Sequence, residues 1–218
     1  MFTAGKIIIA DDHPLFRNAL CQAIKQPFPD ITLLECDTIS GLERTLDNNL
    51  DTDLILLDLQ MPGANGFSGV ILTRKSFPEI PVIVVSASED TAIIKRAIDY
   101  GASGFIPKSS DLPTISEAIQ CVLKGDIWLP IEDFEEDQAN EEKEFATRVK
   151  SLTPQQLRVF MMLTKGLLNK QIAAEINVSE ATVRTHMTAI FRKLGVRNRT
   201  QAVLAANYLS LERPDTNH

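Results

Sequence analysis

Four short apolar segments of this chain each lead into residues that are suited to phosphoryl chemistry. These residues are, in chain order, Asp11 and Asp12, Asp58, Ser86, and Lys108. Carboxylates bind hard cations or act as nucleophiles, whereas a lysine or a serine can bond phosphoryl oxygens. One such segment would indicate little, because aspartate and serine are also common helix caps and lysine is common in solvated loops. Four such segments in one chain predict that these residues form a single site.

Repulsion among the three aspartates indicates that this site holds a cation. Two carboxylates about 4 Å apart repel by roughly 4 kcal/mol at an effective dielectric near 20. Mg²⁺ accepts carboxylate oxygens and completes its shell with water and phosphate oxygens, so it fits this position. Asp58 then remains as a nucleophile toward a phosphoryl donor. Lys108 and the metal would stabilise charge on the transferred group, and Ser86 would bond one of its oxygens.

Alternating strands and helices are expected to bring these residues together. Hydrophobic periodicity in the region 1–128 predicts strands at 6–10, 31–36, 53–57, 81–85 and 104–106, and helices at 14–26, 39–48, 66–76, 90–100 and 112–124. Near-continuous Ile, Val and Leu in two of the strands is typical of a parallel sheet covered on both faces. We therefore expect an α/β doubly wound domain with a five-stranded, flavodoxin-like parallel sheet. Ligands bind such sheets beyond the carboxyl ends of the strands.

The segment 129–150 interrupts this alternation. It is rich in glutamate and aspartate and has few apolar residues, which predicts a solvated linker. The sequence leaves open whether its last part, 143–150, is helical. The linker would separate the domain 1–128 from a second domain at 151–218.

Helix signals dominate the second domain. Thr153-Pro154 with Gln156 predicts the start of a helix over about 154–165. Further caps predict a short helix from Asn169, a helix from Ser179 to Leu194, and a last helix from Asn198 to about 209. Two helices joined by a tight turn form a helix-turn-helix arrangement, so we expect a small all-α domain of that kind. The core face of its second helix carries Val183, Met187, Ile190 and Leu194.

Charge distribution indicates a polyanionic partner for this second domain. The chain has a net charge of −7, yet residues 151–218 hold nine Lys or Arg against four Asp or Glu. The face of the helix after Ser179 that lies away from the core is suited to the major groove of duplex DNA, and basic residues at helix ends and turns are suited to phosphates. A solvated helix face is the alternative interpretation. The predicted DNA contacts are Lys170, Ser179, Thr182, Arg184, Thr185, Thr188, Arg192, Lys193, Arg197 and Asn198.

Several other classes of protein are disfavoured. No apolar stretch approaches the length of a membrane span, and the first residues lack a signal-peptide pattern, so we expect a cytoplasmic protein without a membrane partner. The three cysteines, Cys21, Cys36 and Cys121, have no spacing typical of a disulfide framework or a zinc site. No set of histidines supports a metal site, and His13 is expected only to help begin the helix that follows it.

Taken together, the motifs resemble those of a NarL/LuxR-family response regulator of two-component signalling. Residues 5–124 resemble a receiver domain, and 151–210 resemble a LuxR-type helix-turn-helix domain. The motifs that carry the resemblance are Asp11-Asp12, Asp58-Leu-Gln-Met-Pro-Gly63, Ser86-Ala87, Gly101-Ala-Ser-Gly-Phe-Ile-Pro-Lys108, Leu152-Thr-Pro-Gln-Gln156, Asn169-Lys-Gln-Ile-Ala173, Val178-Ser-Glu-Ala-Thr-Val-Arg-Thr-His186 and Arg192-Lys-Leu-Gly-Val-Arg-Asn-Arg199.

The resemblance implies a mechanism of control. A sensor histidine kinase would phosphorylate Asp58, and Mg²⁺ would bind Asp12, Asp58 and the Gln60 carbonyl with help from Asp11. Lys108 would contact the phosphoryl group, while Ser86 and Phe105 would form the switch. Many receivers carry tyrosine where this chain has Phe105, so a hydroxyl contact by this ring is excluded.

The resemblance also implies partners. The active protein is expected to be a homodimer on DNA that uses the helix at 198–209, with RNA polymerase as a further candidate partner.

Three hypotheses of different classes follow from the sequence. The first is a phosphorylation-controlled DNA-binding transcriptional regulator that is not an enzyme beyond phosphorylation and dephosphorylation of its own Asp58. The second is an Mg²⁺-dependent phosphatase or phosphotransferase that uses Asp58 as nucleophile, although the chain has no insertion to build a substrate pocket. The third is a constitutive DNA-binding protein with a silent receiver, which the intact aspartate, lysine and serine set disfavours.

Overall fold

The computed structural model describes residues 5–64, 66–130 and 140–211 of the chain. It divides into two compact units, Met1–Glu136 and Asp137–His218, called here the N-terminal unit and the C-terminal unit. Residues 131–139 of the predicted linker at 129–150, and residues 212–218 of the predicted second domain, lie outside the described residues. Among the helices that are described, none is both long enough and apolar enough to cross a membrane.

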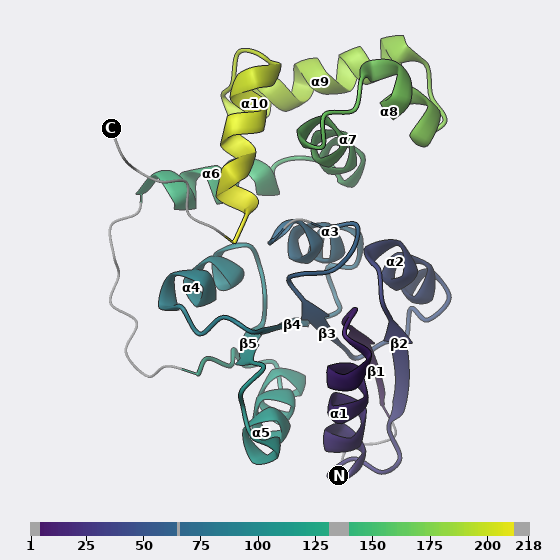
Figure 1. Ribbon diagram of the computed structural model, residues 1–218, viewed down its shortest axis with the longest axis vertical. Coiled ribbons are helices and arrows are strands. Elements are labelled where there is room, and N and C mark those ends of the chain that lie inside the picture. Colours follow the sequence, from purple (N-terminus) through teal and green to yellow (C-terminus); the bar gives the residue numbers. More distant parts are fainter. Residues whose placement is uncertain (1–4, 65, 131–139, 212–218) are drawn as a thin grey trace. The chain divides into compact units, whose positions relative to one another are not determined.

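A five-stranded parallel sheet forms the centre of the N-terminal unit (Figure 1). Its strands are β1 (Lys6–Ala10), β2 (Thr32–Cys36), β3 (Leu54–Asp58), β4 (Val82–Ser86) and β5 (Gly104–Pro107), in the order β2-β1-β3-β4-β5. The predicted doubly wound fold is confirmed, and each predicted strand is present within about one residue of its expected bounds. Because β2 and β3 lie on opposite sides of β1, the winding reverses at β1, where such folds bind ligands.

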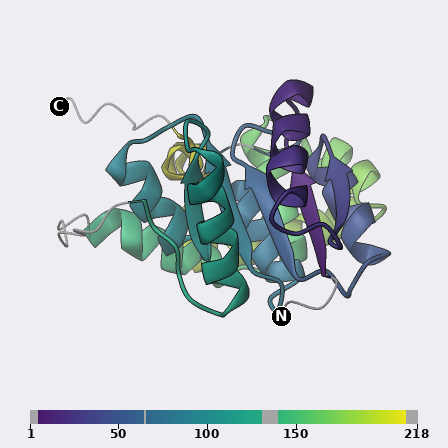
Figure 2. The ribbon, with the colours of Figure 1, turned by 90° about the horizontal axis from the view of Figure 1, so that it is seen from below.

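Five helices cover both faces of this sheet (Figures 1 and 2). On one face lie α1 (Pro14–Lys25) and α5 (Leu112–Leu123), which pack together. The other face carries α2 (Ile39–Asp47), α3 (Ser68–Ser76) and α4 (Thr91–Asp99). Every residue of β3 and β4 is buried between these layers, which explains the near-continuous Ile, Val and Leu in both strands.

The free edge of β5 is covered by the chain that follows α5. The backbone N–H of Phe105 donates to the Trp128 carbonyl at 3.1 Å, and the Trp128 N–H donates to the Ser103 carbonyl at 3.1 Å. A Cβ atom at Gly104 would lie 3.2 Å from that same Trp128 carbonyl, so this close approach favours glycine. Residue 128 therefore belongs to the N-terminal unit, where it satisfies an otherwise unpaired sheet edge.

The C-terminal unit is helical, as predicted. It contains α7 (Pro154–Thr164), α8 (Asn169–Glu175), α9 (Glu180–Leu194) and α10 (Arg199–Ala205), which continues as a 3-10 turn over Ala206–Leu209. Thr153 and Gln156 form the predicted capping box, and the Ser179 and Asn198 side chains cap α9 and α10. The sequence predicted Asn169 as the N-cap of α8. In the structure Asn169 is instead the first residue of this helix.

A further helix, α6 (Asn140–Lys150), occupies much of the segment that was expected to be a solvated linker. The sequence left open a helix over 143–150, and the structure has one there, but the expectation that this part is solvated is wrong, because Phe145, Ala146 and Val149 recur on one helical face and are buried. The Phe145 ring packs against the Tyr208 ring at 5.2 Å, and Arg148 Nη1 donates to the Leu194 carbonyl at 3.2 Å. α6 is therefore part of the C-terminal unit.

Candidate functional site

The carboxyl ends of neighbouring strands bring the predicted phosphoryl residues to one edge of the sheet. Asp58 is the last residue of β3, Ser86 is the last residue of β4, and Lys108 follows β5 directly. Asp11 follows β1, whose neighbour in the sheet is β3. Because parallel strands end at the same edge, this placement follows from the fold alone. Lys108 contacts Asp11 and Asp58, and the carboxylate of Asp12 lies in one group with the other two.

Lys108 bridges two of the buried aspartates. Its Nζ lies 2.7 Å from Asp11 Oδ2 and 2.9 Å from Asp58 Oδ2, and it also lies 4.7 Å from the centre of the Phe16 ring. Burial alone would lower the pKa of Lys108, but the hydrogen bonds and negative charges of the two aspartates outweigh it and raise this pKa above its usual value. The ammonium group is therefore held charged at the centre of the site.

The two aspartates that Lys108 contacts are almost fully buried. Asp11 is 1% exposed and Asp58 is 4% exposed. Each keeps its second oxygen fixed by a backbone donor: the His13 N–H donates to Asp11 Oδ1 at 2.7 Å, and the Gln60 N–H donates to Asp58 Oδ1 at 3.1 Å. The carboxylates are thus oriented before any ligand arrives. No distance places the Gln60 carbonyl among the metal ligands, so that assignment stays a prediction.

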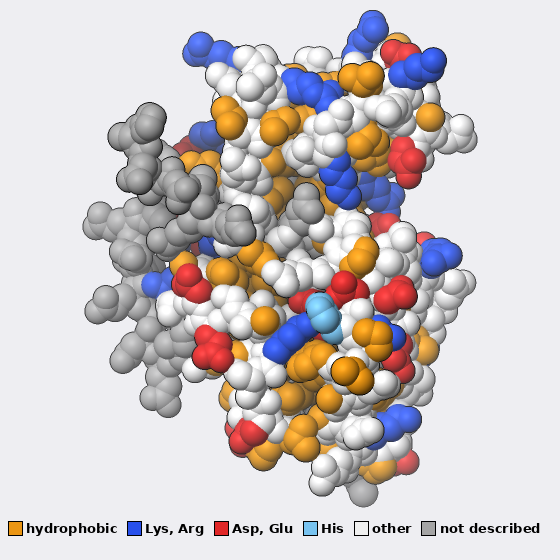
Figure 3. Space-filling view, viewed as in Figure 1, with side chains coloured by type: hydrophobic (Ala, Val, Ile, Leu, Met, Phe, Trp, Pro, Cys, Tyr) orange, Lys and Arg blue, Asp and Glu red, His pale blue; other side chains and the backbone are white. Residues whose placement is uncertain are grey.

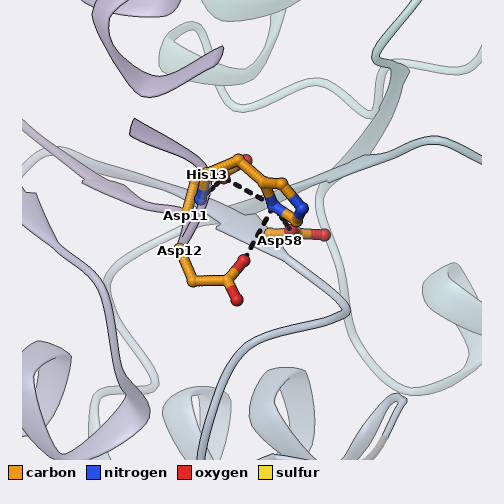
Figure 4. A group of neighbouring side chains, drawn as sticks. All are labelled: Asp11, Asp12, His13 and Asp58. Carbon is orange, nitrogen blue, oxygen red and sulfur yellow. Dashed lines mark hydrogen bonds and ion pairs between the residues drawn. The ribbon is translucent and has the colours of Figure 1, made fainter. Parts of the chain in front are cut away.

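The remaining oxygens of the cluster fit a divalent cation. Asp12 Oδ1 is shielded from solvent and has no hydrogen-bond partner in the described part of the chain, although it lies 2.8 Å from His13 Nδ1, whereas Asp11 Oδ2 is paired with Lys108. One oxygen from each aspartate lies within 4.8 Å of the others, as Figure 4 illustrates. Mg²⁺ is bound by one or two carboxylates and keeps several waters, so Asp12 and Asp58 are suited to hold it.

His13 belongs to this cluster, which the sequence did not lead us to expect. Its Nδ1 lies 2.8 Å from Asp12 Oδ1, and the other two aspartates are within 4 Å of the same nitrogen. The expected role in starting α1 is only partly met: His13 holds the N-cap position, but its side chain makes no capping hydrogen bond. The sequence feature that could have indicated this placement is the position of His13 directly after Asp11 and Asp12.

The two predicted switch residues are both buried. Ser86 is 3% exposed, and its Oγ accepts a hydrogen bond from the Ser88 N–H at 3.3 Å. Phe105 is 0% exposed in the core of β5. At the rim of the site, the Ser109 hydroxyl donates to Glu89 at 2.5 Å and so links the loops that follow β4 and β5. This link was not predicted from the sequence.

The predicted DNA-contacting face lies on α9. Val183, Ile190 and Leu194 are buried as expected, whereas Met187 is only half-buried. The opposite face is exposed and carries Arg184, Thr185, Thr188 and Arg192. Both threonine hydroxyls donate to backbone carbonyls one turn earlier, at 3.1 and 3.0 Å. Their methyl groups are therefore the parts left for contacts with thymine.

Other predicted DNA contacts have partners inside the C-terminal unit. Lys193 Nζ donates to the Ser151 carbonyl at 2.7 Å and to Gln156 Oε1 at 2.8 Å, and is thus engaged at the start of α7. Ser179 and Thr182 bond one another at the start of α9, and Asn198 caps α10. These four residues have structural roles that the helix signals only partly indicated.

Two further predicted contacts, Lys170 and Arg197, are exposed. They lie at the start of α8 and after α9, and Lys and Arg side chains stand out over this unit in the space-filling view (Figure 3). Arg199, by contrast, donates to the Leu163 and Leu167 carbonyls at the end of α7. The exposed cations suited to DNA are therefore fewer than the sequence indicated.

Known proteins match both units. The family described as the response regulator receiver domain matches residues 7–120, and the LuxR family of bacterial regulatory proteins matches 150–206. The chain is 44% identical over 209 residues to the glycerol metabolism activator of Pseudomonas putida, covering 92% of this chain and 94% of that protein. It is 34% identical over 208 residues to the nitrate/nitrite response regulator NarP of Escherichia coli, covering 93% and 94%.

Solved structures of response regulators have the same fold as this chain. The RcsB response regulator of Salmonella typhimurium matches with a TM-score of 0.55 at 23% identity, covering 93% of this chain and 98% of that one, which supports the fold. The signal receiver domain of the putative response regulator NarL from Mycobacterium tuberculosis matches with a TM-score of 0.51 at 28% identity, covering 57% and 99%. The chain belongs to the NarL/LuxR family of response regulators, which join a receiver domain to a LuxR-type DNA-binding domain and act as transcriptional regulators rather than as enzymes.

Proposed function

We propose that Asp58 accepts a phosphoryl group and that this modification controls duplex DNA binding by α9. The observation that carries the proposal is the Lys108 ammonium, which is shared between Asp58 and Asp11 at the carboxyl end of the sheet. A buried carboxylate beside a fixed cation and a second acidic group is suited to nucleophilic attack on phosphorus. The donor chemistry that fits is the phosphohistidine of a sensor kinase.

The transfer balances as a simple exchange of bonds. A carboxylate oxygen of Asp58 bonds the phosphorus while the phosphorus–nitrogen bond of the donor breaks, and the donor imidazole keeps the electron pair and takes up a proton. Lys108 pairs with the charge on the phosphoryl oxygens. Asp11, Asp12, Asp58 and the Gln60 carbonyl would hold Mg²⁺, which when bound neutralises part of the negative charge on both reactants.

The response of the protein is proposed to be a shift between two conformations. Ser86 ends the strand beside Asp58 and has a hydroxyl that can bond a phosphoryl oxygen, and Phe105 lies in the next strand, β5. Repacking of Phe105 would change the surface formed by α4 and β5, because both elements contact one another. The active protein is proposed to dimerise on DNA through α10, with RNA polymerase as a further partner.

Intact mass measurement tests the acceptor directly. The protein is incubated with Mg²⁺ and acetyl phosphate, and a gain of about 80 Da is expected, because one phosphoryl group is added to one carboxylate. Asp58→Asn should not gain it. Asp53→Asn is the matched control, because Asp53 lies just before the other end of β3, where it accepts a hydrogen bond from the Lys6 N–H. If both variants fail to gain the phosphoryl mass, or if both gain it, Asp58 is not identified as the acceptor.

DNA binding measured on the same samples tests the control step. Phosphorylated wild-type protein should bind promoter fragments more tightly than untreated protein, and Asp58→Asn should not respond to acetyl phosphate. Equal affinity with and without the phosphoryl group would favour the silent-receiver hypothesis. Repeated turnover of small phosphoesters would instead favour a phosphatase.

A further inference from the structure

His13 turns its imidazole into the acidic cluster instead of away from it. The ring is 62% exposed, so one side reaches solvent, yet Nδ1 faces three carboxylates. This nitrogen lies 2.8 Å from Asp12 Oδ1, 3.4 Å from Asp11 Oδ1 and 3.8 Å from Asp58 Oδ2. Figure 4 shows these contacts converging on the ring. A hydrogen bond donated by Nδ1 could serve only one of the three.

The distances from Nδ1 to the three carboxylate oxygens are compatible with ligands around one ion. Ligand atoms about 2.1 Å from a shared ion lie about 3.0 Å apart at right angles and about 3.4 Å apart at tetrahedral angles. The three distances from Nδ1, which are 2.8, 3.4 and 3.8 Å, correspond to angles of about 85° to 130° at such an ion. Nδ1 is thus placed as a ligand atom among the carboxylate oxygens.

The local backbone holds the imidazole in this place. The His13 N–H donates to Asp11 Oδ1 at 2.7 Å, which curls the loop after β1 around the acidic pair. Pro14 follows as the first residue of α1, and a residue before proline is restricted to extended backbone, as His13 is, with φ of −94° and ψ of 101°. Two independent constraints therefore fix the backbone from which the imidazole reaches the cluster.

We propose that His13 Nδ1 is a nitrogen ligand of the acidic site and makes it a site for borderline divalent transition ions such as Zn²⁺, in competition with Mg²⁺. An all-oxygen site suits Mg²⁺, whereas an imidazole nitrogen suits Zn²⁺ and its neighbours. The inference rests on the proposed metal site of Asp12 and Asp58 and adds a residue that selects among metals. It makes the occupancy of this site depend on which divalent ions are available.

Metal affinities of variants test the selection. Imidazole ligands suit Zn²⁺ and carboxylate ligands suit Mg²⁺, so the informative quantity is the change in each affinity that a substitution causes. Titration calorimetry of the full-length protein with ZnCl₂ and with MgCl₂ is compared for wild type, His13→Ala and Asp12→Asn. His186→Ala is the matched control, because it removes a histidine from the C-terminal unit, on α9.

The expected pattern is selective. His13→Ala should lower the Zn²⁺ affinity about tenfold or more, the scale that metal-site contacts carry. The Mg²⁺ affinity should stay within about threefold, since Mg²⁺ prefers oxygen ligands and keeps several waters, and this also shows that the variant is folded. Asp12→Asn should weaken both ions, and His186→Ala should change neither at this site. On adding Zn²⁺, but not Mg²⁺, the ¹⁵N resonance of His13 Nδ1 should move to a metal-bound position.

Two results would overturn the inference. One is an unchanged Zn²⁺ affinity in His13→Ala, and the other is an equal change for both ions, as expected if the imidazole only competes with cations. The phosphorylation assay separates this failure from that of the proposed function. If Asp58 gains a phosphoryl group with Mg²⁺ while His13→Ala leaves Zn²⁺ binding unchanged, the phosphoacceptor assignment stands and the assignment of His13 as a ligand does not.

Discussion

Charged groups at the candidate phosphoryl site of the N-terminal unit lie buried against one another, whereas those on the predicted DNA-contacting face of α9 are exposed. Lys108 contacts Asp11 and Asp58 at hydrogen-bond distance, and both carboxylates are almost fully buried. On α9, Arg184 and Arg192 are exposed. The first arrangement fixes geometry before a small group arrives, and it costs desolvation. The second leaves long side chains free to adapt to a polyanion, and it costs little until binding.

The comparison teaches where a charge matters for folding. A buried charge that loses its partner leaves an uncompensated ion in a region of low polarity, whereas an exposed charge is already solvated. Substitutions in the two units should therefore affect different measurements: stability in the first and DNA affinity in the second. Four variants test this division, from the largest expected effect to the smallest.

Lys108→Met should lower the free energy of unfolding by about 3 kcal/mol in the absence of divalent cations, because it leaves two buried carboxylates without their shared cation. Denaturant titration measures the loss. Lys124→Met, which removes an exposed lysine from the same unit, is the matched control and should stay within about 0.5 kcal/mol. Equal losses in the two variants would break the distinction between buried and exposed charge.

Arg184→Ala should weaken specific DNA binding by about 1 to 3 kcal/mol, the value of a side chain that reads a base edge. The free energy of unfolding should change by less than about 0.5 kcal/mol, since this arginine is exposed. Fluorescence anisotropy with an operator and with a scrambled duplex measures the effect. If the affinity for both duplexes falls equally, Arg184 contacts phosphate and not bases.

Lys193→Ala should lower the stability of the C-terminal unit by about 1 kcal/mol, because its ammonium donates two hydrogen bonds to the start of α7. The salt dependence of DNA binding should stay unchanged, in contrast to a phosphate-contacting lysine. A reduced salt slope with unchanged stability would return Lys193 to the DNA interface that its sequence position suggested.

Lys170→Ala should have the smallest effect. It should weaken binding to all duplexes alike and reduce the slope of log affinity against log salt by about one, the contribution of one phosphate contact. Affinities measured over a range of salt concentrations give this slope. A change confined to one operator sequence would contradict a role in phosphate contact.

Much of the N-terminal unit was predictable because its signals are local. Each apolar strand and each helical pattern is visible in a short window, and the parallel arrangement then places every strand end at one edge. The grouping of Asp58, Lys108 and the other site residues at one edge of the sheet could therefore be predicted from the sequence. The direction of the His13 side chain could not, since it depends on how the chain bends between β1 and α1.

The missed features of the C-terminal unit depend on contacts between distant residues. Phe145 and Val149 are only two apolar residues among many charges, and nothing local indicates that α9 and Tyr208 provide their partners. Lys193 resembles a phosphate contact in sequence, and only the fold places it beside Gln156. The residue type at position 193 shows that a cation is present, but it does not show which group the lysine contacts.

The contacts of α6 define where this regulator can be divided. Arg148 donates to the last carbonyl of α9, and the Phe145 ring lies against Tyr208, so a fragment that begins at residue 151 would lose both contacts. A C-terminal fragment that keeps these contacts should therefore begin at or before Asn140, not at residue 151, where the predicted helix-turn-helix domain begins. In hybrid regulators made by exchanging receivers, junctions placed before α6 should preserve operator binding, and junctions inside it should not.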